Sequence, residues 1–340
     1  MLRKASGALA AIALVASLAT AAPASAAGVS LTGEGSSFAG TALIAAQSVF
    51  NAKGGAQVNY TKSSSGKGRA NVAKGTVDFG ASDISFSAAG EKAPAGTVIT
   101  PLLGGPIAIV YNLSSVGNGL KLDSKTLGAI FAGTITKWDD AAIKKLNPGK
   151  TLPSAAIQVR FRTPGSGTTA NLTQYLEGTG AKGWNANNGD FTAASGAKSV
   201  VGVQVPSTSD MVTAVAKTAN TIGYIDLADA DGKGLDYAAL KNPAGQFVLP
   251  TVAASKAFLS VQPIAADGGA LLDFTKKIKN AYNLSAFAYG IGSSASSTDA
   301  KGAGVKAFFT HVVNSALPAG YVALSGAAKA AALKQIAKIK

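Results

Sequence analysis

The sequence lacks cysteine altogether and has a single histidine, His311, among its 340 residues. Without cysteine, the chain can form neither a disulfide nor a thiolate metal site, and it offers no cysteine for a lipid anchor. One histidine leaves no conventional His-based catalytic triad and no His-rich metal cluster. His311 lies in an apolar stretch of a predicted helix, where a surface or boundary position explains it better than catalysis.

Other catalytic patterns are also missing. No G-x-S-x-G nucleophile motif occurs in the sequence. Asp139 and Asp140 are neighbours on a predicted helix, so their carboxylates do not face each other, and helix capping explains them better. Gly149-Lys150-Thr151 resembles the end of a P-loop, but Lys144 stands where that motif requires glycine. The sequence therefore predicts a binding protein rather than an enzyme, with no catalytic residue, no metal and no cofactor.

The N-terminus has the pattern of a secretory signal peptide. Arg3 and Lys4 form a basic start, an apolar run extends from about position 8 to 22, and Ala24-Ser25-Ala26 matches a cleavage site. We predict that residues 1–26 are removed and that the mature chain is soluble, in the periplasm or outside the cell. No second apolar run in the sequence is long enough to cross a bilayer.

Positive charge is in excess, with 31 Lys and Arg against 17 Asp and Glu, for a formal charge of +14. Arg3 and Lys4 carry two of these charges, which leaves +12 after cleavage. A basic secreted protein suggests an anionic ligand, nucleic acid or an anionic envelope surface. The lysines are scattered, however, and no basic run is interleaved with aromatic residues, so we expect no nucleic-acid partner.

The stretch around Pro164-Gly165 has the pattern of a strand, a tight turn and the start of a helix. Alternating apolar residues over 157–161 predict a strand, Pro164-Gly165 ends it, and Leu172 begins an apolar spacing typical of a helix. The first turn of a helix presents unpaired N–H groups and the positive end of the helix dipole. This strand, turn and helix together predict a site for an anion, and phosphate is the usual occupant of such a site.

Side chains around the turn would strengthen this anion site. Ser166, Thr168 and Thr169 add hydroxyl donors, and Gly167 lets an anion approach the backbone. Arg162, just before the turn, adds a forked and permanently charged donor. From this stretch alone, an ordinary capped helix with a surface arginine remains an open alternative.

Three further strand ends in the first part of the chain carry small hydroxyl residues. Ser36-Ser37 precedes a helix predicted over 39–51, Ser63 to Gly68 forms a predicted loop before a helix at 69–74, and a strand over 76–83 ends in Ser82-Asp83. In α/β folds, ligands bind outside the carboxyl ends of strands, so these tips are candidates for one shared site.

The alternation of short strands and helices predicts an α/β fold with largely parallel sheets. Gly104-Gly105 reads as a flexible pair that leads into a buried strand, and we place a domain crossover there. Ser124 is the predicted cap of a helix that extends to Phe131. The predicted division is a first domain of residues 27–103 plus 285–340 and a second of 104–284.

The order and spacing of several motifs resemble the periplasmic phosphate-binding proteins of PstS-type ABC importers, over nearly all of the mature chain. Each motif alone is a weak signal, but the order and spacing of the whole set are specific for this family. The blocks are Leu31-Thr32-Gly33-x-Gly35-Ser36-Ser37-Phe38, Val58-Asn59-Tyr60 with Ser65-Gly66, Val77-Asp78-Phe79-Gly80-Ala81-Ser82-Asp83, Gly104-Gly105, Leu127 to Asp140, Leu146-Asn147-Pro148-Gly149, Arg162-x-x-Gly165-Ser166-Gly167-Thr168 and Ile222-Gly223-Tyr224.

The resemblance implies a type II binding-protein fold, two α/β domains with phosphate held in the cleft between them. It implies delivery of inorganic phosphate to a membrane ABC permease. A monomer suits such a two-domain clamp, although the sequence leaves the oligomeric state open. The binding residues that it implies are Ser37, the backbone of Phe38, Ser65, Asp83, Arg162, Ser166, Gly167 and Thr168.

The chain departs from the family pattern beside the arginine. The family usually has an acid two residues after it, and this chain has Pro164, so Arg162 lacks that local carboxylate. Ser37 stands where threonine is common, and Ala39 where proline usually follows. Two other functions stay open at this point: a secreted phosphatase related to the family, and a basic envelope protein that keeps the fold without transport.

Overall fold

The computed structural model describes residues 28–186, 189–197, 201–295 and 300–340, so the predicted signal peptide lies outside the described residues. The strands are β1 Ser30–Gly35, β2 Gln57–Lys62, β3 Phe79–Ser82, β4 Thr97–Tyr111, β5 Lys121–Leu122, β6 Gln158–Arg162, β7 Val203–Val205, β8 Thr221–Asp226, β9 Asp236–Tyr237, β10 Ala239–Lys241, β11 Phe247–Val248 and β12 Ser285–Ser293. The helices are α1 Gly40–Ala52, α2 Ser65–Ala73, α3 Ser124–Phe131, α4 Ala141–Leu146, α5 Gly167–Gly178, α6 Phe191–Ala194, α7 Thr208–Lys217, α8 Leu227–Asp231, α9 Val252–Leu259, α10 Ala300–Asn314 and α11 Gly326–Ile336.

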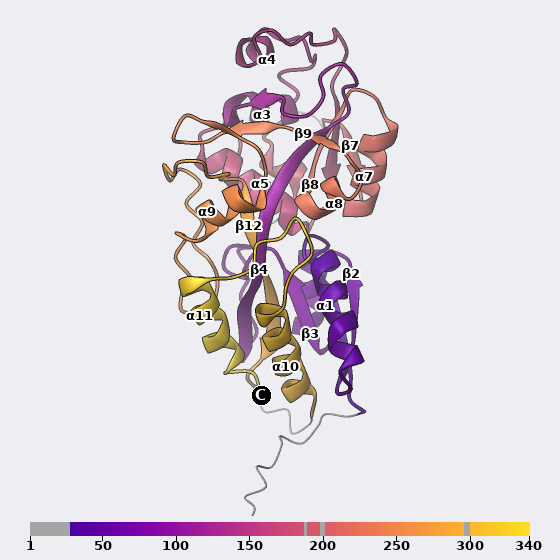
Figure 1. Cartoon of the computed structure of the whole chain (residues 1–340), viewed down its shortest axis with the longest axis vertical. Helices are drawn as coiled ribbons and strands as arrows, with labels where there is room; N and C mark the ends of the chain where they lie inside the picture. Colours follow the sequence, from indigo (N-terminus) through magenta and orange to yellow (C-terminus); the bar gives the residue numbers. More distant parts are fainter. Residues whose placement is uncertain (1–27, 187–188, 198–200, 296–299) are drawn as a thin grey trace, which may run out of the picture.

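The main sheet has the order β2-β1-β3-β12-β4-β8-β6-β7, and β9 also pairs with β4. Strand β4 links the two parts of this sheet, because it pairs with β12 up to Pro106 and with β8 from Ile107 onward. Figure 1 shows β4 as a long strand that follows the long axis of the molecule. We call β2, β1 and β3 with α1 and α2 the first half, and β8, β6 and β7 with α5 and α7 the second half.

The prediction of largely parallel sheets is wrong at the centre of the molecule. Within the first half, β1 is parallel to β2 and β3, and within the second half β6 is parallel to β7 and β8. In contrast, β12 is antiparallel to β3 and β4, and β4 is antiparallel to β8. Strands β4 and β12 pass between the halves in opposite directions, and such a pair needs no crossover helix.

The glycine pair Gly104-Gly105 is not a flexible lead into a strand, as predicted, because both residues lie inside β4. Gly104 exchanges backbone hydrogen bonds with Val322, at 2.9 and 2.7 Å. A Cβ atom at Gly104 would lie 2.4 Å from Cδ1 of Leu259. Glycine therefore permits close packing at this position rather than forming a turn.

Aromatic side chains form much of the core that supports both halves. In the first half, the Phe79 ring on β3 lies 5.5 and 5.6 Å from the rings of Phe308 and Phe309 on α10. In the second half, Phe161 on β6 stacks on Phe191 with ring centroids 4.7 Å apart. This packing anchors β3 and β6 in the core, and polar residues follow where these strands end. Across the described ranges, no helix combines the length and apolar character needed to cross a membrane.

Candidate anion-binding site

Strand ends from the two halves of the sheet meet at one place, and the eight predicted site residues are all buried there. The first half contributes the loop between β1 and α1, the start of α2 and the end of β3. The second half contributes the end of β6 and the first turn of α5. The residues brought together are Ser37, Phe38, Ser65, Asp83, Arg162, Ser166, Gly167 and Thr168.

Asp83 is the acidic centre of the first-half contribution, and its side chain is 3% exposed. Ser36 Oγ donates a hydrogen bond to Asp83 Oδ1, and Ser65 Oγ donates to Oδ2 at 3.2 Å. The Ser65 hydroxyl oxygen also accepts from the Asp83 backbone N–H at 2.9 Å. Across the junction, Asn171 Nδ2 on α5 donates to the Asp83 carbonyl oxygen at 2.9 Å. Hydroxyl and amide groups therefore fix Asp83 on several sides.

Burial raises the pKa of Asp83 from 3.8 to about 6. The hydrogen bonds from Ser36 and Ser65 and the positive charges of Arg162 and Arg69 lower it, but desolvation is the larger effect. A carboxyl group with a pKa in this range can carry a proton or release it near neutral pH. Asp83 can therefore accept a hydrogen bond from a protonated oxyanion without a large change in its own state.

Arg162 is the cationic centre of the second-half contribution, and it is 2% exposed. Its Nη1 donates to Ser37 Oγ at 3.2 Å and to Thr208 Oγ1 at 3.1 Å, and its Nη2 donates to the Pro206 carbonyl at 3.3 Å. Within the described residues, Arg162 forms no ion pair with a carboxylate, and its Nε is buried without a partner. Among the described residues, no carboxylate lies close enough to neutralise the positive charge of this guanidinium.

The first turn of α5 is held rigidly beside Arg162. Ser166 caps the helix, and its hydroxyl oxygen accepts from the Thr169 N–H at 3.2 Å. The Tyr224 hydroxyl on β8 accepts from the Arg162 backbone N–H at 2.9 Å and lies 2.7 Å from Thr169 Oγ1. The predicted strand, turn and helix are confirmed, and the capped helix and the buried arginine occur together rather than as alternatives.

The two halves touch at Gly167. A Cβ atom there would lie 2.2 Å from Ser65 Oγ and 2.7 Å from Asp83 Oδ2, both in the first half. Beside it, the Gly66 N–H donates to the Gly165 carbonyl at 2.9 Å. Only a residue without a side chain permits this approach, so Gly167 is required for contact between the halves.

Some sequence predictions around the site are wrong. Ser65 opens α2 rather than lying in a loop, because the Ser64 hydroxyl accepts from the Lys67 N–H and starts the helix four residues before Arg69. Likewise Asp123, not Ser124, caps α3 by accepting from the Thr126 N–H at 2.8 Å.

Sequence reasoning gave no individual role to three residues that contact the site, namely Ser36, Asn171 and Thr208. Ser36 adjoins the predicted Ser37, and the carboxyl end of a strand was the available signal for it. Asn171 and Thr208 carried no signal of their own, because each acts through a contact with a residue that is distant in sequence.

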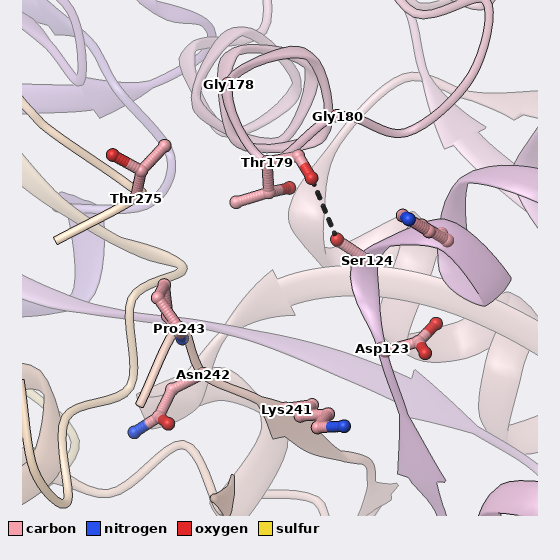
Figure 2. A pocket seen from close by; sticks show the side chains of 10 residues that line it. Asp123, Ser124, Gly178, Thr179, Gly180, Lys241, Asn242, Pro243 and Thr275 are labelled. Carbon is pink, nitrogen blue, oxygen red and sulfur yellow. Dashed lines mark hydrogen bonds between the residues drawn. The ribbon is translucent and has the colours of Figure 1, made fainter. Parts of the chain in front are cut away.

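A surface cavity of about 580 Å³ lies elsewhere, where α3 begins and α5 ends. None of the predicted site residues lines it. Figure 2 shows the side chains of Lys241 and Asn242 extending in opposite directions, and the Asn242 amide is bonded to the carbonyls of Ile278 and Ala281. The buried site is therefore the better candidate, since its polar groups converge. Within the described residues, no three His, Asp or Glu side chains are grouped so that they could hold a metal ion.

Comparison with known proteins places this geometry in a family. Residues 20–316 match the model of the PBP superfamily domain. A high-affinity periplasmic phosphate-binding protein, PfluDING, solved with bound phosphate, superimposes with a TM-score of 0.68 at 24% identity, over 89% of this chain and 92% of that one. A phosphate-binding protein from Stenotrophomonas maltophilia gives 0.64 at 17% identity, over 90% and 93%. The chain therefore has the type II fold of the periplasmic binding proteins.

Relatives found by sequence comparison include phosphate-binding proteins of the PstS type. The phosphate-binding protein PstS of Xylella fastidiosa is 35% identical over 254 residues, which cover 74% of this chain and 67% of that protein. The PstS protein of Pasteurella multocida is 36% identical over 222 residues, covering 65% and 63%. The chain belongs to the PstS family of phosphate-binding proteins.

Proposed function

We propose that the protein is a non-enzymatic receptor that binds inorganic phosphate outside the cytoplasm and delivers it to an ABC-type importer in the membrane. The observation that carries this proposal is the buried meeting of Arg162, hydroxyl groups and a helix N-terminus with Asp83, whose pKa burial raises to about 6. Relatives and structural neighbours named as phosphate-binding proteins support it.

The proposed contacts divide by chemistry. Arg162 supplies positive charge, and the hydroxyls of Ser37, Ser65, Ser166 and Thr168 donate hydrogen bonds to phosphate oxygens. The backbone N–H groups of Phe38 and Gly167 add further donors. Asp83 accepts a hydrogen bond from the hydroxyl group that hydrogen phosphate still carries near neutral pH. Sulfate has no such proton, so it would face the Asp83 oxygen without a hydrogen bond, and a buried polar group left unpaired rejects a ligand strongly.

The site also suggests how the protein works. We infer two domains, 27–103 with 285–340 and 104–284, which close on phosphate by bending where β4 changes partner at Pro106 and Ile107. A monomer suits such a clamp. We further propose that residues 1–26 are a cleaved signal peptide and that the mature protein acts in the periplasm or at the cell exterior.

Calorimetric titration of the folded, ligand-stripped mature protein with phosphate, at about neutral pH and with sulfate as control, tests this function. We expect one-to-one phosphate binding and no sulfate binding. Absence of binding to any small oxyanion would contradict the proposal and favour a basic envelope protein that has kept the fold. Turnover of a chromogenic phosphate ester by the pure protein would instead favour a phosphatase.

A further inference from the structure

Thr208 contacts the two predicted binding residues that come from opposite halves of the sheet. Its Oγ1 lies 2.9 Å from Ser37 Oγ and accepts from Arg162 Nη1 at 3.1 Å. Nη1 also reaches Ser37 Oγ at 3.2 Å, so the three groups form a closed triangle. Thr208 itself is 3% exposed, which places this triangle away from solvent.

The hydroxyl of Thr208 is not needed for the helix that it begins. Ser207 is the cap of α7, because its hydroxyl oxygen accepts from the Asp210 N–H at 3.1 Å. Among the described residues, the Thr208 hydroxyl forms hydrogen bonds only with Ser37 and Arg162. A buried hydroxyl is costly unless it is bonded, so these contacts account for its position.

The segment 206–208 supplies most of what holds the guanidinium in place. Nη2 donates to the Pro206 carbonyl at 3.3 Å, and Nη1 donates to Thr208. Position 164 carries proline and offers no carboxylate. Arg162 is thus held by neutral oxygens, which fix its direction and leave its charge available to an anion.

A count of protons shows why the triangle suits an anion. Ser37 and Thr208 each accept a hydrogen bond from Arg162 Nη1, and each carries one hydroxyl proton. One of these protons makes the bond between the two hydroxyl oxygens, whichever residue donates it. The other remains free to point at a ligand oxygen.

We propose that Thr208 is a positioning residue of the phosphate site, whose neutral hydroxyl orients Arg162 and connects it to Ser37 of the first half. This inference rests on the proposed function, and it assigns to Thr208 the orienting role that no carboxylate among the described residues fills at bonding distance. The proposed role belongs to the hydroxyl rather than to the methyl group.

Phosphate titrations of the full mature protein and of Thr208→Val, Thr208→Ser and Thr213→Val test the proposal. Thr208→Val replaces the hydroxyl with a methyl group of similar size, and we expect phosphate affinity to fall roughly ten- to a hundredfold, the range for losing a hydrogen bond to a charged group. Thr208→Ser keeps the hydroxyl and should bind within about threefold of wild type. Thr213 lies on the exposed face of the same helix, bonded to the Ser209 carbonyl, so Thr213→Val should bind as wild type does.

The outcomes separate this inference from the proposed function. Equal binding by wild type and Thr208→Val would overturn the role of Thr208 and leave phosphate binding intact. Equal weakening in Thr208→Val and Thr208→Ser would show that the hydroxyl alone does not account for the effect, and would also overturn the proposed role. No binding by wild type would overturn both. Should Thr208→Val fail to fold, Thr208→Ala, which also removes the hydroxyl, replaces it in the same comparison.

Discussion

Replacing Gly167 with alanine is expected to weaken phosphate binding by at least roughly a hundredfold, because small displacements of converging groups are that costly. The added Cβ would lie 2.2 Å from Ser65 Oγ and 2.7 Å from Asp83 Oδ2. Neither group can move away easily, because Ser65 is bonded to Asp83 and both are buried. The two halves would be held apart, and the donors of the second half could not reach an anion bound by the first.

Gly178→Ala is the matched control for Gly167→Ala. Gly178 is the last residue of the same helix, and a Cβ there would meet only Phe274 Cδ2, at an ordinary 3.9 Å. We expect this variant to bind phosphate as wild type does and to unfold at an equal or higher temperature. Wild-type affinity in Gly167→Ala, measured by the same titration, would mean that contact between the halves at this glycine is not needed for binding.

Replacing Asp83 with asparagine is expected to reduce the preference for phosphate over sulfate by roughly a hundredfold or more, since a buried hydrogen-bond partner decides such discrimination. The amide removes the negative charge that repels sulfate, and it leaves one fewer acceptor for the proton of hydrogen phosphate. Phosphate affinity should fall and sulfate affinity should rise. Competition titrations with both anions at about neutral pH measure the ratio.

Asp139→Asn serves as the charge-matched control, since it changes the net charge equally and lies in a surface ion pair with Lys144. Its anion preference should equal that of wild type. Unchanged discrimination between phosphate and sulfate in Asp83→Asn would show that the Asp83 carboxylate does not distinguish a protonated anion from an unprotonated one.

The same substitution should change the pH dependence of stability in the unliganded protein. The pKa of Asp83 is raised in the folded state from 3.8 to about 6, so folding favours its protonated form. The resulting cost is absent at low pH, grows as pH rises from about 4, and is complete above about 6, reaching about 3 kcal/mol at most. The stability of Asp83→Asn relative to wild type should therefore be more favourable at pH 7 than at pH 5.

Denaturant unfolding at the two pH values, without phosphate, measures this difference. Burial also raises the pKa of Asp226, but that group is present in both proteins and cancels in the comparison. A stability difference that grows on acidification would contradict the assigned direction for Asp83.

Local signals in the sequence predicted the second-half part of the site well. The alternation before Arg162, the break at Pro164-Gly165 and the helical spacing after it each reflect backbone geometry within a few residues. The start of α2 was less visible, because either Ser63, Ser64 or Ser65 could cap a helix, and only the structure shows that Ser64 does.

Features that depend on distant contacts could not be predicted. Nothing near Ser36 indicates that its hydroxyl, as well as that of Ser65, would donate to Asp83. The antiparallel centre of the sheet follows from the path of β4 and β12 between the halves, which alternating strands and helices do not indicate. The resemblance to phosphate-binding proteins supplied the residue set, and the fold supplied its geometry.

The central claim is that phosphate binds where the two halves meet, between Asp83 and Arg162. A crystal structure of the mature protein grown with phosphate tests it most directly. We expect one phosphate within hydrogen-bond distance of the Arg162 guanidinium, the Asp83 carboxyl group and the first turn of α5. Phosphate bound only elsewhere, such as the cavity beside Lys241 in Figure 2, would contradict the account.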